Sequence, residues 1–181
     1  MKQAKAIPTE WNGINFRSRL EARWAAFFSL CGIKWLYEPV DLEGYIPDFI
    51  VQQRDELLVE VKPITRHDNP EIAAAHKKIA ESGWTGKAMV VGAQLFDGFT
   101  LDVGFDRNGR SLFLGTCPTC HHFSIVFAGC EFCGGGIESG VGVRKTGMRI
   151  WNLAGNQVQW QSSRVNEPTL MRNLIRPDRL P

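Results

Sequence analysis

The sequence predicts an α/β protein, and three stretches of the chain carry this prediction. Residues 15–30, NFRSRLEARWAAFFSL, repeat apolar side chains at the spacing of an amphipathic helix. Residues 46–62 hold two β-branched and aliphatic runs on either side of a polar segment, which is the pattern of a β-hairpin. A helical pattern over residues 71–82 precedes the apolar run 87–92, so this helix would cross over to a buried strand of the sheet.

Length and composition limit the class of protein. The chain has 181 residues, of which 44% are hydrophobic and 22% charged, enough for one good core with or without a small appendage. Its net charge of +2 is too small to indicate a nucleic-acid partner, so any basic surface must be local. The first eleven residues lack the apolar core of a signal peptide, and no stretch approaches the roughly 20 apolar residues of a membrane span. We therefore expect a cytoplasmic protein with no membrane association.

The first helix is expected over residues 15–30, with Asn15 as its N-cap and Gly32 just after its end. Glu21 lies at the edge of the apolar stripe, so its carboxylate can point toward the sheet on which the helix packs. The alternative is an exposed glutamate paired with Arg17, four residues earlier. The stripe itself comprises Phe16, Leu20, Trp24, Phe27 and Cys31.

A short strand is expected over residues 33–38, between this helix and the hairpin. Pro39 follows it and confines it to a sheet edge or a strand end, because proline cannot donate to a ladder. Glu38, at the end of this strand, is interpreted as a rim charge. Residues 41–44 would form the loop into the hairpin.

The hairpin brings two acidic side chains together. If its five-residue loop, 52–56, is centred on Arg54, then Asp48 lies opposite Glu60. Side chains alternate along a strand, so Lys62 shares a face with Glu60. Like charges opposed across a ladder destabilise a sheet unless something neutralises them. The pattern therefore indicates a site for a cation.

Carboxylate oxygens are the ligands that Mg²⁺ or Mn²⁺ prefers, and here they would come from Asp48 and Glu60, with the backbone carbonyl of Val61 as a further ligand. Lys62 could orient or deprotonate a metal-bound water and stabilise charge on a phosphate. The alternative is a solvated strand face with an ion pair between Glu60 and Lys62, and with Asp48 as a turn residue after Pro47.

Four runs of the sequence, FRSRLEARWAAFF, GIKWLYEP, YIPDFIV and LLVEVKP, together resemble the PD-(D/E)XK nuclease superfamily. The resemblance covers about residues 14–95 and is nearest to small phage and mobile-element endonucleases and to junction-resolving and transposon-end-cleaving members. It implies a restriction-endonuclease-like core, in which a mixed central β-sheet is flanked by helices. It also implies hydrolysis of phosphodiester bonds with Mg²⁺ or Mn²⁺.

The resemblance also implies roles for individual residues. Asp48 and Glu60 would bind the metal ion, Glu21 would act through a water or on a second ion, and Lys62 would position the attacking hydroxide. The helix after the E-x-K strand is expected over residues 71–82, with Asn69 as its cap and Pro70 in its first turn. In related nucleases this helix often carries a polar or basic residue near the scissile phosphate. The candidates are His76, Lys77 and Lys78, each with a solvated cationic face as the alternative, and Arg17 is a further candidate for substrate binding.

The second half of the chain holds a second expected hairpin, residues 99–105 and 111–115, with a turn at Asn108-Gly109.

Two C-x-x-C pairs follow, separated by nine residues, and can wrap one tetrahedral Zn²⁺ in a small β-rich, zinc-ribbon-like module. A four-thiolate site is closed, so this zinc would be structural. His121 or His122 replacing a cysteine, and a disulfide or redox pair, are the alternatives. The ligands would be Cys117, Cys120, Cys130 and Cys133.

The remaining segments are less distinct. Residues 134–147 are rich in glycine and predict a mobile loop, whose Arg144 and Lys145 are candidate phosphate contacts or parts of a solvated linker. Residues 149–161 fit a helix or a hairpin, with the helix preferred. Residues 164–181 predict an arm or a poorly ordered tail.

The sequence therefore predicts a nuclease-like core over residues 1–98, a hairpin and zinc module over 99–148, and a C-terminal helix or hairpin with an arm over 149–181. The expected function is a DNA endonuclease in phage, mobile-element or defence-related DNA processing, located in the host cytoplasm if phage-encoded. RNA as the substrate remains open, as does a homodimer or a larger nuclease complex. The alternative function is a catalytically inactive, nucleic-acid-binding zinc protein that acts as a subunit or an inhibitor of a larger machine.

Overall fold

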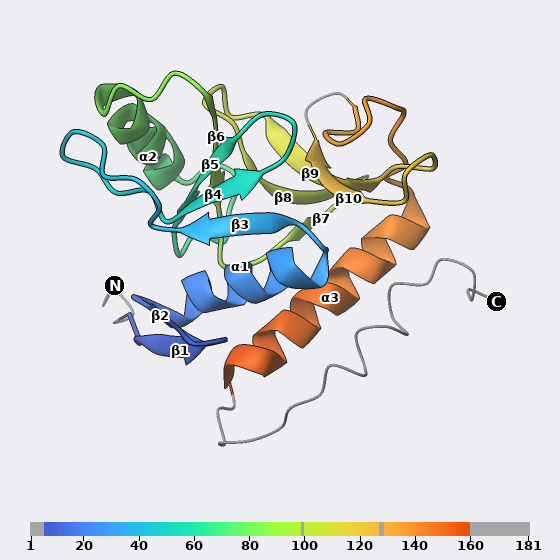
Figure 1. Ribbon diagram of the computed structural model, residues 1–181, viewed down its shortest axis with the longest axis horizontal. Helices are drawn as coiled ribbons and strands as arrows, with labels where there is room; N and C mark the ends of the chain where they lie inside the picture. Colours follow the sequence, from blue (N-terminus) through green and yellow to red (C-terminus); the bar gives the residue numbers. More distant parts are fainter. Residues whose placement is uncertain (1–5, 99, 127–128, 160–181) are drawn as a thin grey trace.

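The computed structural model describes residues 6–98, 100–126 and 129–159 of the chain, drawn in Figure 1. None of the helices in these ranges combines the length and the apolar character needed to cross a bilayer. In chain order the elements are β1 (Thr9–Trp11), β2 (Ile14–Phe16), α1 (Arg19–Leu30), β3 (Lys34–Tyr37), β4 (Phe49–Gln52), β5 (Leu57–Val61), α2 (Pro70–Glu81), β6 (Lys87–Val91), β7 (Phe96–Asp97), β8 (Leu101–Phe105), β9 (Ser111–Thr116), β10 (Phe123–Val126) and α3 (Val141–Gln159).

One mixed sheet forms the centre of the described protein. Its strand order is β10-β9-β8-β6-β5-β4-β3, and β7 pairs with β8 outside this path. β5 and β6 are parallel because α2 carries the chain across between them, and the remaining neighbours are antiparallel. β1 and β2 form a separate two-stranded sheet. The predicted α/β class, with a mixed sheet and flanking helices, is therefore confirmed.

Helices cover both faces of the sheet. α1 and α3 lie side by side on one face, and α2 lies on the other (Figure 1). Because side chains alternate along a strand, Met89 and Val91 of β6 join the large apolar cluster under α1 and α3, whereas Val90 joins the smaller cluster under α2. The sheet thus has an apolar core on each side, as expected for a strand reached by a crossover.

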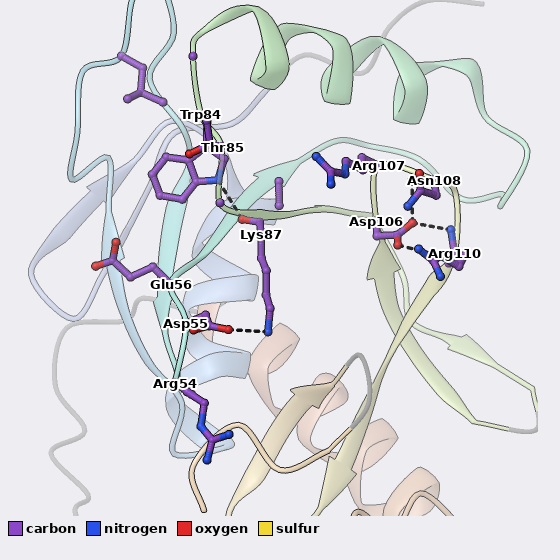
Figure 2. Close-up of a pocket in the computed structure, with 14 residues that line it drawn as sticks. Arg54, Asp55, Glu56, Trp84, Thr85, Lys87, Asp106, Arg107, Asn108 and Arg110 are labelled. Atoms are coloured by element: carbon purple, nitrogen blue, oxygen red, sulfur yellow. Dashed lines mark hydrogen bonds and ion pairs between the residues drawn. The ribbon is translucent and has the colours of Figure 1, made fainter. Parts of the chain in front are cut away.

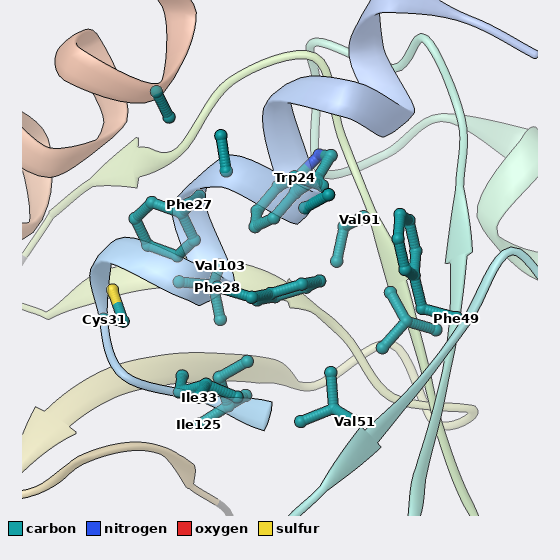
Figure 3. Packing of buried hydrophobic residues seen from close by; sticks show 14 of the residues in the cluster. Trp24, Phe27, Phe28, Cys31, Ile33, Phe49, Val51, Val91, Val103 and Ile125 are labelled. Atoms are coloured by element: carbon teal, nitrogen blue, oxygen red, sulfur yellow. The ribbon is translucent and has the colours of Figure 1, made fainter. Parts of the chain in front are cut away.

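Aromatic side chains of α1 fill the larger core. Trp24, Phe27 and Phe28 are fully buried between the sheet and α3 (Figure 3). The Trp24 ring lies 4.7 Å from the ring of Trp151 on α3, and its indole N–H donates to the Gly92 carbonyl at 2.9 Å. These contacts fix α1 relative to the end of β6, where the candidate site lies.

The start of α1 differs from the prediction. Asn15 lies in β2, and the N-cap is Ser18, whose hydroxyl accepts from the Glu21 backbone N–H at 3.2 Å. The physical reason is the S-x-x-E spacing of Ser18 and Glu21: Ser18 accepts the Glu21 backbone N–H, and the Glu21 carboxylate accepts the Arg17 backbone N–H just before the cap. The predicted end is confirmed, because Gly32 follows the last turn with a positive φ of 69°.

Several predicted elements are confirmed. The short strand before Pro39 is β3, which ends the sheet as an edge strand. α2 begins after the N-cap Asn69 with proline in its first turn, and it buries His76 among its core-facing residues. The second hairpin is β8 and β9, and Gly109 in its turn has a positive φ of 73°. Because β8 pairs with both β6 and β9, the sheet continues across the boundary expected at residue 98.

The glycine-rich segment 134–147 is not a loop throughout, because α3 begins at Val141 and runs to Gln159. The helical alternative for residues 149–161 is therefore confirmed as far as 159, and the expected tail 164–181 lies outside the described residues. Glycine has a packing role here. A Cβ at Gly147 would lie 2.3 Å from Cδ2 of Leu101, so only glycine lets α3 approach the sheet this closely.

We predict that Gly147→Ala lowers the free energy of unfolding by about 1–3 kcal/mol, because Leu101 and Leu114 are fully buried and have no room to move away. Gly142→Ala is the matched control in the same helix, since its Cβ would meet nothing within 4 Å. The control should be neutral or stabilising by up to about 1 kcal/mol. Urea denaturation of both variants measures the difference, and equal effects would contradict this account of Gly147.

Candidate functional site

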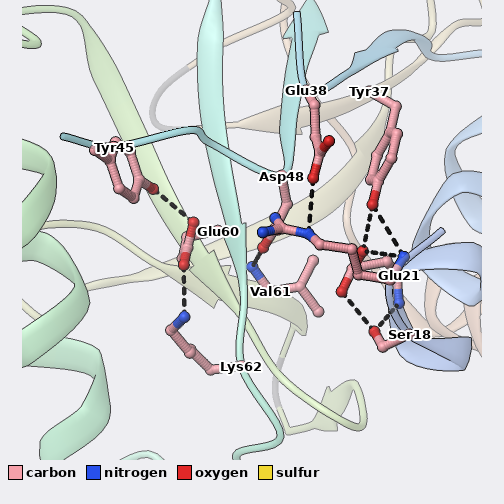
Figure 4. Close-up of polar contacts among 10 residues, drawn as sticks. Ser18, Glu21, Tyr37, Glu38, Tyr45, Asp48, Glu60, Val61 and Lys62 are labelled. Atoms are coloured by element: carbon pink, nitrogen blue, oxygen red, sulfur yellow. Dashed lines mark hydrogen bonds and ion pairs between the residues drawn. The ribbon is translucent and has the colours of Figure 1, made fainter. Parts of the chain in front are cut away.

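Three buried carboxylates lie where α1 begins, where β4 begins and where β5 ends (Figure 4). Glu21 is 8% exposed, Asp48 5% and Glu60 7%. In the hairpin ladder Ile50 pairs with Leu58, as predicted, and continuing this register places Asp48 opposite Glu60. Burying three carboxylates without compensating charges or hydrogen bonds costs free energy, so each one needs partners in the fold.

Asp48 is held by one backbone and one side-chain donor. The Val61 N–H donates to its Oδ2 at 2.7 Å, and Arg17 Nη2 donates to its Oδ1 at 2.7 Å. Burial, followed by the negative charge of Glu60, raises the pKa of Asp48 to about 7, although the Val61 N–H and Arg17 act in the opposite direction. The carboxyl therefore lacks sufficient positive charge nearby, which is the electrostatic condition that a bound cation relieves.

Glu60 has two side-chain donors on its own side of the hairpin. The Tyr45 hydroxyl donates to Oε2 at 2.5 Å, and Lys62 Nζ donates to Oε1 at 2.5 Å. Burial, together with the adjacent Glu60 carboxylate, raises the pKa of the Tyr45 hydroxyl, so it stays protonated and remains a donor at neutral pH. Figure 4 shows Lys62 and Tyr45 reaching the same carboxylate from different directions. The shared face predicted for Glu60 and Lys62 leads to this ion pair.

Glu21 belongs to the helix start as well as to the acidic group. Its Oε1 accepts from the Ser18 hydroxyl at 2.7 Å, and its Oε2 accepts from the Tyr37 hydroxyl at 2.7 Å. Oε2 also accepts the Arg17 backbone N–H at 3.1 Å. The alternative of an exposed glutamate paired with the Arg17 side chain is thus wrong, because Glu21 is buried and only the backbone of Arg17 reaches it.

These acids do not form a closed metal cage. Within the described residues, the only group of three or more histidine, cysteine or acidic side chains whose ligand atoms gather closely is the four-cysteine cluster. Asp48 and Glu60 offer the carboxylate oxygens that a magnesium-type ion prefers, and such an ion is commonly held by one or two carboxylates while waters and substrate phosphates complete its shell. Glu21, whose oxygens accept from Ser18 and Tyr37, is the third buried carboxylate beside them.

The candidate substrate contacts are more scattered. His76 is buried, with Nε2 3.0 Å from the Phe105 carbonyl, so it is not presented to solvent. Lys77 and Lys78 are exposed on α2, and Lys77 lies 3.7 Å from Glu81. Arg144 pairs with Asp97 at 2.7 Å. Lys145 is exposed beside it in the first turns of α3, which lie at the opposite end of the molecule from the start of α1 (Figure 1).

The four predicted zinc ligands, Cys117, Cys120, Cys130 and Cys133, come together. Their sulfur atoms all lie within 4.8 Å of one another. The Sγ atoms of Cys117 and Cys133, and those of Cys120 and Cys130, are 3.5 Å apart, close to the roughly 3.8 Å expected for a tetrahedron with Zn–S bonds of about 2.3 Å. The cluster is therefore consistent with a structural zinc site.

Backbone donors lower the pKa of two of these four thiols, Cys117 and Cys130. Although burial opposes the change, the N–H groups of Cys133 and Phe132 lower the pKa of Cys130 to about 6, so the thiolate is accessible at neutral pH. The His122 ring stacks on Phe132 at 4.7 Å, and His121 adopts a positive φ of 58° in the first turn of the cluster. Neither histidine is a member of the four-ligand group.

The cysteine cluster is tied to the turn of the acidic hairpin. Gln53 forms two hydrogen bonds with the backbone of Ile125 on β10: its Nε2 donates to the carbonyl at 3.1 Å and its Oε1 accepts the N–H at 3.0 Å. The Arg54 N–H donates to the Glu131 carbonyl, between Cys130 and Cys133, at 2.8 Å. Lys87 pairs with both Asp55 and Glu131. The cysteine-rich turns thus support the end of the hairpin that is remote from Asp48 and Glu60.

An open cavity of about 850 Å³ lies beside this turn, not at the acidic site (Figure 2). It is bounded by the starts of β5 and β6 and by the β8–β9 turn, whereas Asp48 and Glu60 lie at the other end of the hairpin. Two of its four basic side chains pair with acids of its lining, Arg110 with Asp106 and Lys87 with Asp55. The cavity is therefore separate from the buried carboxylates.

Three residues that hold the acids were not recognised from the sequence: Ser18, Tyr37 and Tyr45. Ser18 had a detectable signal, the S-x-x-E spacing with Glu21. The two tyrosines had none, because each one reaches its carboxylate through the tertiary fold, across 16 residues for Tyr37 and Glu21 and 15 for Tyr45 and Glu60.

No protein-family model matches this chain, and the searches of curated proteins and of solved structures also find no match.

The raised pKa of Asp48 predicts a specific pH dependence of stability in chelator. The folded protein holds this proton up to about pH 7, whereas the unfolded chain releases it near pH 4, so the folded state loses stability as pH rises between these values. The loss should approach about 1.4 kcal/mol per pH unit at most. Asp48→Asn cannot titrate and should lack this loss. Urea denaturation of both proteins from pH 4.5 to 8 tests this, and parallel curves would contradict it.

We also predict one zinc ion per chain. Cys130→Ser should lose it and become less stable, because a structural zinc contributes directly to folding. Cys31→Ala is the control, since Cys31 is buried in the core and is not part of the cluster. Elemental analysis of the purified proteins measures the metal. Retention of a full zinc equivalent by Cys130→Ser would remove this residue from the ligand set.

Proposed function

We propose that this chain is an endonuclease of the PD-(D/E)XK type, which hydrolyses phosphodiester bonds in DNA with the help of Mg²⁺ or Mn²⁺. The observation that carries the proposal is the convergence of Asp48, Glu60 and Lys62 at one end of the β4–β5 hairpin, with Glu21 at the adjacent helix start (Figure 4). Acidic residues and a lysine in this arrangement are suited to phosphoryl transfer, which needs positioning and charge neutralisation more than covalent chemistry.

Asp48 and Glu60 are the residues that would hold the metal ion. A bound Mg²⁺ or Mn²⁺ would supply a water of lowered pKa and neutralise charge on the phosphate. Asp48 suits this role because one of its oxygens is fixed by the Val61 N–H at 2.7 Å, so the carboxylate is oriented before any ion arrives. Its raised pKa supports the same role, because a cation would offset the repulsion from Glu60.

Lys62 is the candidate for orienting the nucleophile. Its side chain is 31% exposed and ends on Glu60, so the ammonium group lies at the boundary between the buried acids and solvent. From there it can donate a hydrogen bond to an attacking water or to a phosphate oxygen. The roles of Tyr37 and Tyr45 would be to hold Glu21 and Glu60 in place through their hydroxyl groups.

The cysteine-rich turns would have an indirect role in this function. They contact the hairpin at Gln53 and Arg54, at the end away from the acids. A closed four-thiolate zinc site would stabilise the hairpin that carries Asp48 and Glu60. Phage, mobile-element or defence-related DNA processing is the setting in which we place such an enzyme.

One observation favours the second candidate, a zinc protein that binds nucleic acid without cutting it. Each of the six carboxylate oxygens of Glu21, Asp48 and Glu60 already accepts a hydrogen bond from a protein donor. A site that keeps these pairs already has part of its negative charge compensated, which would weaken its affinity for an ion. This candidate would bind DNA equally well in chelator and would nick no substrate with any divalent ion.

A cleavage panel separates the two candidates. Purified protein should cut DNA with Mg²⁺ or Mn²⁺ but not with a chelator, when single-stranded, duplex, flapped and branched DNAs and matched RNAs are compared. Lys62→Met should lower the cleavage rate by at least about 100-fold, because it removes the donor beside the nucleophile. Asp48→Ala should lose cleavage while keeping its zinc.

Lys34→Met is the matched control. Lys34 is exposed at the start of β3, where it pairs with Gln52 in the ladder, whereas Tyr37 at the other end of β3 contacts Glu21. It removes the same charge from the same sheet and should cleave like the wild type. Wild-type-like cleavage by Lys62→Met or Asp48→Ala would remove these residues from the mechanism. Binding without any cleavage by the wild type would favour the second candidate.

A further inference from the structure

Arg17 occupies an unusual place at the acidic site. Its Nη2 donates to Asp48 Oδ1 at 2.7 Å, and its Nε donates to Glu38 Oε1 at 2.7 Å, so one guanidinium group spans a buried and a partly exposed acid. The side chain remains 57% exposed. Arg17 is therefore a solvent-accessible cation placed directly on the oxygen of Asp48 that the Val61 N–H leaves open.

The backbone around Arg17 is fixed, although its side chain is not enclosed. The Arg17 N–H donates to Glu21 Oε2 and to the Tyr37 hydroxyl, both at 3.1 Å. The residue follows β2 and precedes the N-cap Ser18, so both flanks belong to regular structure. A side chain with a fixed base and an exposed end can change partners without any movement of the fold.

Glu38 is held in a conformation that favours this contact. It has a positive φ of 44°, which is uncommon for a residue other than glycine, and its N–H donates to the Asp48 carbonyl at 3.1 Å. Such a backbone state persists only where the surrounding structure maintains it, and it is often found at functional sites. Here it places a second carboxylate 2.7 Å from Arg17 Nε, beside the buried acids.

We propose that Arg17 is a displaceable cation: it pairs with Asp48 in the metal-free protein, leaves Asp48 when a divalent ion binds, and then contacts a phosphate of the nucleic acid while Glu38 retains its Nε. This inference rests on the proposed function for its last step. An ion that binds Asp48 through Oδ1 and the guanidinium group of Arg17 are both cations that compete for the same oxygen, so binding of one weakens binding of the other. The released Nη2 and the neighbouring Nη1 form a planar fork that matches a phosphate.

The first consequence concerns metal affinity and does not depend on cleavage. Removing the competitor should tighten binding, so Arg17→Ala should bind Mn²⁺ about fivefold more tightly than the wild type, the factor expected for one partly exposed ion pair. Arg19→Ala is the matched control. Arg19 is exposed two residues away, so its loss changes the net charge equally but leaves Asp48 Oδ1 untouched.

Titration of zinc-loaded protein with Mn²⁺, followed by the electron paramagnetic resonance signal of free Mn²⁺, measures this effect. Tighter binding by Arg17→Ala than by Arg19→Ala supports the displacement even if the wild type cuts no substrate. Equal or weaker binding by Arg17→Ala overturns it. Arg17→Gln, which keeps a hydrogen-bonding side chain of similar reach, provides the same comparison if the alanine variant does not fold.

The second consequence concerns the phosphate contact. In the Lys62→Met background, chosen because it slows cleavage, loss of Arg17 should weaken binding of a duplex DNA about fivefold with Mn²⁺. In chelator the loss should have little effect, because there the wild-type Arg17 side chain is held by Asp48. Fluorescence anisotropy under the two conditions measures it. The same loss in both conditions, or none in either, overturns the phosphate role. Cleavage by the wild type without this metal-dependent difference would leave the proposed function standing and reject only the inference.

Discussion

The opposition of Asp48 and Glu60 across the β4–β5 ladder is the interaction on which the rest of the site depends. Two like charges on neighbouring strands, each less than a tenth exposed, oppose folding unless other groups compensate them. Four groups compensate these charges. Asp48 accepts from the Val61 backbone N–H and the Arg17 guanidinium group, and Glu60 accepts from the Lys62 ammonium group and the Tyr45 hydroxyl. Burial, followed by the repulsion from Glu60, still raises the pKa of Asp48, so this compensation is incomplete.

The rest of the molecule keeps this hairpin in place from both sides. Trp24 on α1 bonds to the backbone at Gly92, just after β6, and packs on Trp151 of α3, so one face of the sheet is rigidly packed. At the far end of the hairpin, the turn is bonded to β10 and to the cysteine-rich segment. The acids therefore lie at one end of a hairpin whose other end and one face are fixed, and this rigidity would suit the proposed role of holding an ion.

Local patterns in the sequence were sufficient for much of this arrangement, but contacts across the fold were not. The loop length of the hairpin determined its register, and thus the pairing of Ile50 with Leu58 and the proximity of the two acids. The spacing of the cysteines likewise predicted their cluster. In contrast, the sequence suggests that Gly147 belongs to a loop, and its role appears only in its close packing against Leu101. The tyrosine hydroxyls that bind Glu21 and Glu60 also come from segments distant in the sequence. The S-x-x-E spacing of Ser18 and Glu21 is visible in the sequence. However, an apolar stripe that extends back to Phe16 predicts an earlier helix start than the chain adopts.

The two hydrogen bonds between Gln53 and Ile125 have a consequence for how the molecule behaves in a crowded solution. β10 ends the sheet, and an outer strand normally offers its backbone groups to any passing chain, the route by which proteins join edge to edge into aggregates. The amide of Gln53 supplies one donor and one acceptor, as a neighbouring strand would, and so it occupies that position on β10. A single side chain thereby makes one edge of the sheet less available for pairing with a strand of another molecule.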